Sequence, residues 1–272
     1  MKRRPPGKIA DALLALAWGA FWLCLFLLMS RLAAAVVPKD FYPLLAAALM
    51  LPAVLLLPDT AVPDELRELP RLRRAAGLLS LRGIGPLPAL CALVCGAAFN
   101  FAACGAISLL PLPGDAVSAY NDASAPLSDR SFTALCSVVL FVPFLEELTF
   151  RGLILGSFRR GLPAWAALPL SAAVFAVCHA DPIWMAYAMV SGLVLGGLML
   201  TSRSVLPCLM YHSAFNLTNY VRLLLAPTPG RGGYAAMLAG GLAATAAAFA
   251  LFVRSVRPGP SARGNGSQRK EN

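Results

Sequence analysis

Long apolar segments follow one another along almost the whole chain, and they constrain its fold more than any other feature. They cover residues 13–37, 41–57, 84–110, 131–158, 163–179, 183–200, 205–225 and 234–253. Most approach the roughly 20 residues that an α-helix needs to cross the hydrocarbon core of a bilayer, and they lack the alternation of barrel strands. The sequence therefore predicts an all-α fold, a polytopic transmembrane helical bundle of about eight spans.

The charge of the chain is explained by membrane topology. Only 13% of the residues are charged, against roughly 25% in soluble domains. The net charge of +10 does not indicate nucleic acid, because the basic residues gather in alternate loops and form no stripe with aromatic residues. The basic loops include 59–83 and both terminal segments, whereas the loops of the other side hold Lys39, Arg130 and Arg231. This bias predicts that both termini are cytoplasmic. The Ala/Leu-rich composition favours the cytoplasmic membrane of a bacterium.

The spans and loops divide the chain into four parts. We expect an N-terminal transmembrane region over 1–130, a core of four spans over 131–225, a last span over 226–253, and a disordered cytoplasmic tail over 254–272. Gly192 and Gly196 form a GxxxG face in the core, which is typical of close helix packing.

Two carboxylates and a guanidinium interrupt the fourth apolar segment, where a charge costs about 2.5–3.5 kcal/mol on insertion scales. Glu147 and Arg151 are four residues apart, so a helix places them on one face in the favourable order for an ion pair. Glu146 lies about 100° further round the helix, and its own neighbour four residues on is Phe150. We interpret Glu147 and Arg151 as a structural brace and Glu146 as a free carboxylate that can act as general base or acid. The alternative is a purely structural ion pair between helices.

The sequence contains two histidines, and both lie in predicted spans. His179 follows Phe175 by four residues and His212 precedes Asn216 by four, so each pair shares a helix face. In one mechanism, Glu146 and His179 deprotonate a water that attacks a peptide carbonyl, and His212 and Asn216 donate hydrogen bonds to the oxyanion. In a second, Glu146, His179 and His212 hold a zinc ion that activates the water. In a third, the cluster relays protons or ions in a transporter, or binds a peptide in a membrane scaffold without cleaving it.

Three motifs in this order across successive spans carry a family resemblance. They are Glu-Glu-x-x-x-Arg, Phe-x-x-x-His and His-x-x-x-Asn, at Glu146/Glu147/Arg151, Phe175/His179 and His212/Asn216. The set resembles the CAAX protease and bacteriocin-processing (CPBP, or Abi) family of intramembrane endopeptidases, which includes the type II CAAX prenyl proteases. The resemblance covers roughly residues 131–225, and the other spans are only consistent with it.

The resemblance implies the first of the three mechanisms. The family's fold would be a CPBP-type helical core in which Glu146 and His179 activate water and His212 and Asn216 stabilise the transition state. Glu147, Arg151 and Phe175 would support the site. This implies an intramembrane endopeptidase without a metal cofactor, zinc being the alternative. Its partners would be the bilayer and a membrane-associated peptide, CAAX-type among the family possibilities, and no nucleic acid.

Overall fold

The protein is described by a computed structural model over residues 9–58, 62–124, 129, 131–179, 181–225 and 229–256. Every regular element in these ranges is helical, as the apolar pattern predicts, and no strand occurs among them. The last helix continues to Val256, so the first three residues of the predicted tail are helical. The predicted disorder of the remaining tail lies outside the described residues.

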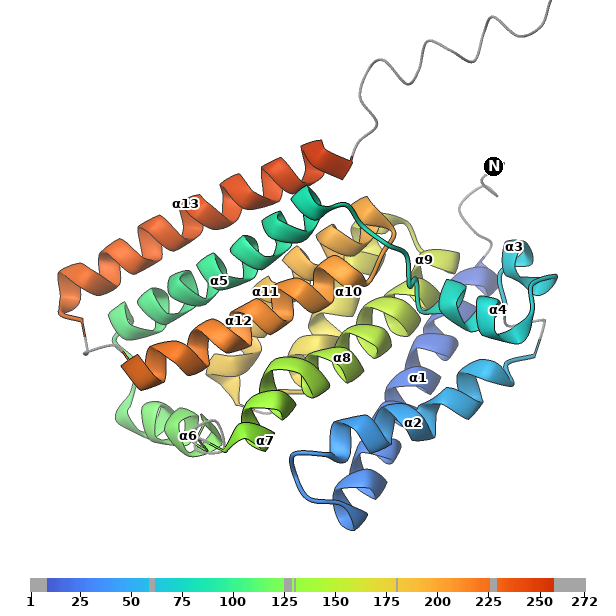
Figure 1. Ribbon diagram of the computed structural model, residues 1–272, viewed down its shortest axis with the longest axis horizontal. Coiled ribbons are helices and arrows are strands. Elements are labelled where there is room, and N and C mark those ends of the chain that lie inside the picture. Colours follow the sequence, from blue (N-terminus) through green and yellow to red (C-terminus); the bar gives the residue numbers. More distant parts are fainter. Residues whose placement is uncertain are drawn as a thin grey trace, which may run out of the picture.

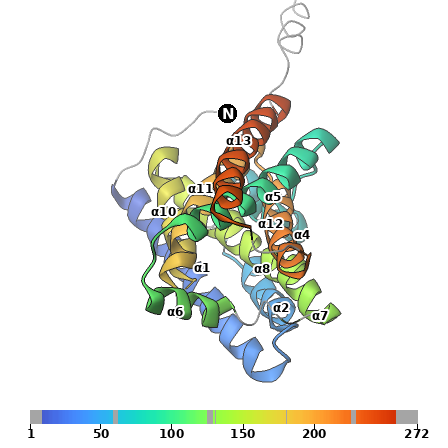
Figure 2. The same cartoon turned by 90° about the vertical axis from the view of Figure 1, so that its left-hand side faces the viewer.

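The long helices run roughly along one axis and form a bundle (Figure 1). They are α1 (Ile9–Val36), α2 (Tyr42–Leu55), α5 (Pro86–Leu109), a composite helix from Phe132 to Gly161, α10 (Ala164–Val177), α11 (Pro182–Ser202), α12 (Leu206–Leu225) and α13 (Arg231–Val256). Short helices lie at the two ends of the bundle, with α3 (Asp64–Arg67) and α4 (Arg71–Leu78) at one end and α6 (Gly114–Ser124) at the other. Figure 2 shows α13, α5 and α12 grouped on one side of the bundle, with α1 and α2 on the other.

Within the ranges that the structure describes, four helices are long and apolar enough to cross a membrane, namely α1, α5, α11 and α13. Two more apolar helices, α2 and α10, are shorter than a full crossing requires. The structure thus supports an integral membrane protein, whereas the count of eight spans stays a prediction. α12 has the necessary length, but its polar side chains, His212 and Asn216 among them, lower its mean hydropathy.

Glycines allow the helices that carry the site to approach closely. A Cβ atom on Gly96 of α5 would lie 2.0 Å from the backbone oxygen of Tyr211 on α12, so only glycine permits this contact. Gly192 and Gly196 of α11 face α10, where added Cβ atoms would meet Ala172 at 3.0 Å and Leu168 at 2.3 Å. The predicted role of this GxxxG face in close packing is confirmed. These contacts fix α12, which carries His212, and α10, whose end is followed by His179, against the rest of the bundle.

Candidate active site

The composite helix from Phe132 to Gly161 carries both glutamates and has an irregular backbone. It begins at Ser131, whose hydroxyl accepts a hydrogen bond from the amide of Ala134 at 3.2 Å. Two stretches with π-helical hydrogen bonding interrupt it, so that it runs as α7 (Phe132–Cys136), η3 (Ser137–Phe141), α8 (Val142–Glu147), η4 (Leu148–Leu155) and α9 (Gly156–Gly161). π-helical turns are rare and often occur at functional sites. Here they flank the two glutamates on both sides.

Glu147 and Arg151 form the predicted ion pair. Arg151 Nη1 donates to Glu147 Oε1 at 3.0 Å, and the two side chains are 1% and 0% exposed. The guanidinium carbon of Arg151 also lies 4.1 Å from the ring centroid of Phe175, a cation–π contact that connects the composite helix to α10. Pairing and stacking together make the buried charge of Arg151 tolerable in the bundle interior.

His212 of α12 lies between the two glutamates. Its Nδ1 atom is 2.8 Å from the same Glu147 Oε1 atom that accepts from Arg151, and its Nε2 atom is 3.9 Å from Glu146 Oε2. An ionised carboxylate only accepts hydrogen bonds, so the Nδ1 atom of His212 carries the proton of this contact. Glu147 therefore orients the imidazole and directs its Nε2 atom toward Glu146. Sequence spacing does not reveal this contact, because nothing in it relates the rotation of α12 to the composite helix.

Glu146 is the less buried of the two carboxylates, with 18% of its side chain exposed. It forms no hydrogen bond to any residue in the described part of the chain, in agreement with the free carboxylate predicted from the helix geometry. It also lies within electrostatic range of Tyr42 on α2 and of Cys178, which precedes His179. The carboxylate thus lies beside His212.

His179 follows the end of α10 and has a defined tautomer. Its Nδ1 atom lies 2.9 Å from the backbone oxygen of Phe175, and because a carbonyl only accepts, Nδ1 is the donor. The neutral ring then keeps a lone pair on Nε2. The ring contacts Phe175 at 4.7 Å between centroids and Trp184 of α11 at 6.3 Å. Trp184 belongs to the surroundings of the site, and the sequence motifs do not mark it.

Phe175 brings the two histidines into one layer. Its ring centroid lies 4.7 Å from that of His179 and 6.1 Å from that of His212, with edge-to-face geometry in both cases. The structure therefore collects Glu146, His179 and His212 in one region of the bundle interior.

The side chain of Asn216 contacts the backbone of the composite helix. Its Nδ2 atom donates to the backbone oxygen of Val138 at 2.8 Å. In the π-helical turn that precedes Pro143, the amide of Val142 donates to the backbone oxygen of Ser137, five residues earlier. With the same spacing, the backbone oxygen of Val138 would accept from the amide of residue 143. Proline has no backbone N–H, and the amide of Asn216 takes its place. This contact leaves the second N–H of Asn216 for another acceptor.

The donors available for a metal ion do not converge. Among the residues that the structure describes, no three His, Cys, Asp or Glu side chains lie close enough together to hold one. The hydrogen bonds of both histidines use Nδ1, His212 with Glu147 and His179 with Phe175, and they leave both Nε2 atoms open, as in many metal-ligating histidines. The zinc alternative, with Glu146, His179 and His212 as ligands, therefore stays a prediction.

The fold and the site define an integral membrane protein of the helical class with a buried glutamate–histidine cluster. Residues 129–218 match the model of a protein family described as type II CAAX prenyl endopeptidase, Rce1-like. This segment contains all seven residues of the three motifs, and the match confirms over these residues the family resemblance that the motifs predict. Searches of curated proteins and of solved structures found no match.

Proposed function

We propose that the protein is an intramembrane endopeptidase that hydrolyses a peptide bond of a membrane-associated, CAAX-type peptide with water activated by glutamate and histidine. The observation that carries the proposal is a continuous chain of contacts, from Glu146 to His212, from His212 to Glu147 and from Glu147 to Arg151. His179 lies in the same region of the bundle. The match of residues 129–218 to a family of CAAX endopeptidases supports the same reaction class.

Glu146 is the proposed general base, assisted by His179. It is the carboxylate that is partly exposed and not ion-paired to arginine. A water near Glu146 gives its proton to the carboxylate, and the resulting hydroxide attacks the carbonyl carbon of the scissile peptide bond. The lone pair on His179 Nε2 suits it to accept a hydrogen bond from the same water and so to orient it, because its Nδ1 proton is donated to Phe175. The C–N bond then breaks, and the leaving amine takes up the proton.

His212 and Asn216 are the proposed donors to the oxyanion. The Nδ1 proton of His212 is committed to Glu147, so the ring donates from Nε2 only when it is an imidazolium. Asn216 supplies its second amide hydrogen while the first stays on Val138. Preorganised donors of this kind are worth about 10²–10³-fold in rate each.

Glu147 and Arg151 support the site without touching the substrate in this proposal. Arg151 fixes the carboxylate of Glu147, and Glu147 fixes the imidazole of His212. Phe175 holds the ring of His179 through its backbone oxygen and contacts the guanidinium of Arg151. The supporting residues thus orient the catalytic ones through direct contacts.

The proposal is tested with the full-length protein in proteoliposomes and a prenylated peptide that ends in a CAAX sequence, with cleavage followed by mass spectrometry. Glu146→Gln keeps the size of the side chain and removes the base, and we expect cleavage to fall by about 10²–10⁴-fold. Glu68→Gln is the matched control, because Glu68 is exposed on the loop between α3 and α4. Retention of full cleavage by Glu146→Gln would refute the base assignment.

Two further measurements separate the alternatives. Exhaustive chelation should leave the activity of the wild-type protein unchanged, and a loss restored by added zinc would favour the metal mechanism. Comparison of membrane peptides from cells with the wild-type and Glu146→Gln proteins identifies natural substrates. A wild-type protein that retains the peptide without cleaving it would favour the scaffold alternative.

A further inference from the structure

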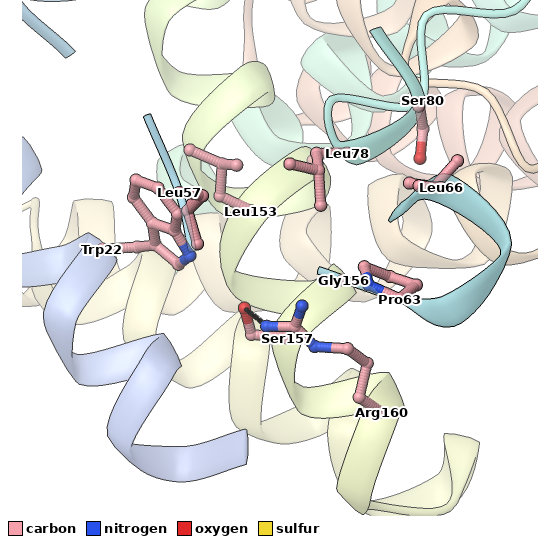
Figure 3. Close-up of a pocket in the computed structure, with 12 residues that line it drawn as sticks. Trp22, Leu57, Pro63, Leu66, Leu78, Ser80, Leu153, Gly156, Ser157 and Arg160 are labelled. Atoms are coloured by element: carbon pink, nitrogen blue, oxygen red, sulfur yellow. Dashed lines mark hydrogen bonds between the residues drawn. The ribbon is translucent and has the colours of Figure 1, made fainter. Parts of the chain in front are cut away.

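A pocket of about 180 Å³ lies outside the glutamate–histidine cluster, at the end of the bundle that carries α3 and α4 (Figure 3). Its walls come from α1, the end of α2, the segment from α3 to α4, and the face of η4 and α9 that includes Gly152 and Gly156. The lining residues are Trp22, Leu57, Pro63, Leu66, Gly77, Leu78, Ser80, Gly152, Leu153, Gly156, Ser157 and Arg160. An apolar cavity of about 150 Å³ is enough to bind benzene, so this space accommodates a short hydrocarbon segment.

The lining of the pocket is mostly apolar, and Arg160 with Ser157 gives it one polar corner. Trp22, Leu57 and Leu153 lie together on one side in Figure 3, and each is at most 7% exposed. Arg160 and Ser157 lie on the other side, where Arg160 Nη2 donates to Ser157 Oγ at 3.0 Å. The seven steps from Leu153 to Arg160 correspond to about 10 Å along a helix axis. A ligand that fits this gradient has a hydrocarbon part and an anionic group.

The space beside Gly156 is open. A Cβ atom on Gly156 would meet nothing within 4 Å, although the residue begins helix α9 and faces the pocket. Glycine inside a helix costs about 1 kcal/mol relative to alanine, and here no close backbone contact requires it. The open space beside Gly156 is thus the feature that a bound molecule would use.

The helix beside the pocket has the character of an interfacial helix. α4 is strongly amphipathic, carries Arg71, Arg73 and Arg74, and contains no acidic residue. Its Leu72 is 76% exposed, as expected where a basic helix rests in the headgroup region of a bilayer. Gly77 and Leu78 of the same helix line the pocket. A bilayer whose headgroups surround α4 would bring anionic lipid beside the residues that line the pocket.

We propose that this pocket binds an anionic phospholipid of the membrane, with part of an acyl chain against Trp22 and Leu153 and the phosphate beside Arg160. The inference does not depend on the proposed hydrolytic activity, because the pocket and the catalytic cluster share no residue. The positive charge of Arg160, with the arginines of α4 close by, selects an anionic over a zwitterionic headgroup.

The test measures how short-chain phosphatidylglycerol and phosphatidylcholine raise the unfolding temperature of the purified full-length protein in a neutral detergent. We expect phosphatidylglycerol to bind about five-fold more tightly than phosphatidylcholine, since one arginine near a headgroup contributes about 1 kcal/mol. Gly156→Leu fills the pocket and should weaken the binding of both lipids by at least about tenfold, because it excludes several methylene groups. Arg160→Gln should remove only the preference for phosphatidylglycerol.

Two matched variants serve as controls. Gly240→Leu adds the same side chain to α13, where the Cβ position is also open, and Arg254→Gln removes an exposed arginine from the last turn of that helix. Both should bind lipid as the wild-type protein does. Equal lipid affinity in Gly156→Leu and Gly240→Leu overturns the site. The absence of a preference between the two lipids in the wild-type protein overturns the assignment of an anionic ligand.

Discussion

Glu147→Gln is the substitution that most directly tests how the buried cluster is held together. Glutamine matches glutamate in size but carries no charge, so the guanidinium of Arg151, 1% exposed, loses its carboxylate partner. Removing one partner of a buried ion pair costs about 3–5 kcal/mol. At roughly 2–4 °C per kcal/mol for a chain of this size class, the unfolding temperature should fall by about 6–20 °C.

A double substitution distinguishes an unpaired charge from lost packing. Glu147→Gln with Arg151→Met removes both charges and keeps two side chains of similar length. Because no uncompensated arginine remains, the double variant should be more stable than Glu147→Gln alone. The coupling between the two sites should reach about 1.5–3 kcal/mol, the range for hydrogen bonds to charged groups.

The measurement is reversible thermal unfolding of the purified proteins in one detergent, followed by near-ultraviolet circular dichroism of the buried aromatic residues. Glu68→Gln, on an exposed side chain, is the control and should stay within about 0.5 kcal/mol of the wild-type protein. The reasoning is refuted if Glu147→Gln is no less stable than Glu68→Gln. It is equally refuted if the double variant loses as much as the two single variants together.

Two further predictions concern packing and pH. Gly96→Ala should destabilise the protein by about 1–3 kcal/mol, because the new methyl group meets the backbone of Tyr211. Gly240→Ala, where the added methyl group meets open space, should be neutral or slightly stabilising. Equal unfolding temperatures of the two variants would contradict this prediction. The ion pair with Lys39, 2.9 Å away, lowers the pKa of Asp129 to about 2. Its stabilising contribution is thus present above the ordinary pKa of 3.8 and is lost as the pH falls through 2. Carboxyl NMR should show that Lys39→Gln raises the pKa of Asp129 toward its ordinary value, and an unchanged value would contradict the pairing.

The fold class and the brace could be predicted from the sequence because both depend on local periodicity. Apolar segments near 20 residues long leave helices as the main solution in a bilayer. The spacing of Glu147 and Arg151 fixes their relative position on one helix, and the ion pair follows from it. The short helices α3, α4 and α6 were not predicted, because they lie in charged and polar loops without a long apolar segment.

The contacts between helices could not be predicted in the same way. The motif of His212 and Asn216 predicts that both face the site, but not that His212 contacts Glu147. That contact depends on the rotation of α12, which the close approach of Gly96 to Tyr211 helps to fix. The π-helical turns could not be predicted from a periodicity of 3.6 residues per turn, because they change which residues share a helix face. Pro143 is the one sequence signal for them, because it removes a donor that Asn216 replaces.

The order of charges in the cluster connects its stability to its orientation. Glu146, His212, Glu147 and Arg151 alternate between acid and base along a chain of contacts of 3.9, 2.8 and 3.0 Å. When His212 is protonated, the two carboxylates and two cations cancel, and the bundle interior contains no net charge from this set. The same protonated state is the one in which the Nε2 atom of His212 can donate toward an oxyanion. Loss of Glu147 should therefore impair the orientation of His212 as well as the stability of the bundle, so that a variant kept folded at low temperature still lacks a correctly held imidazole.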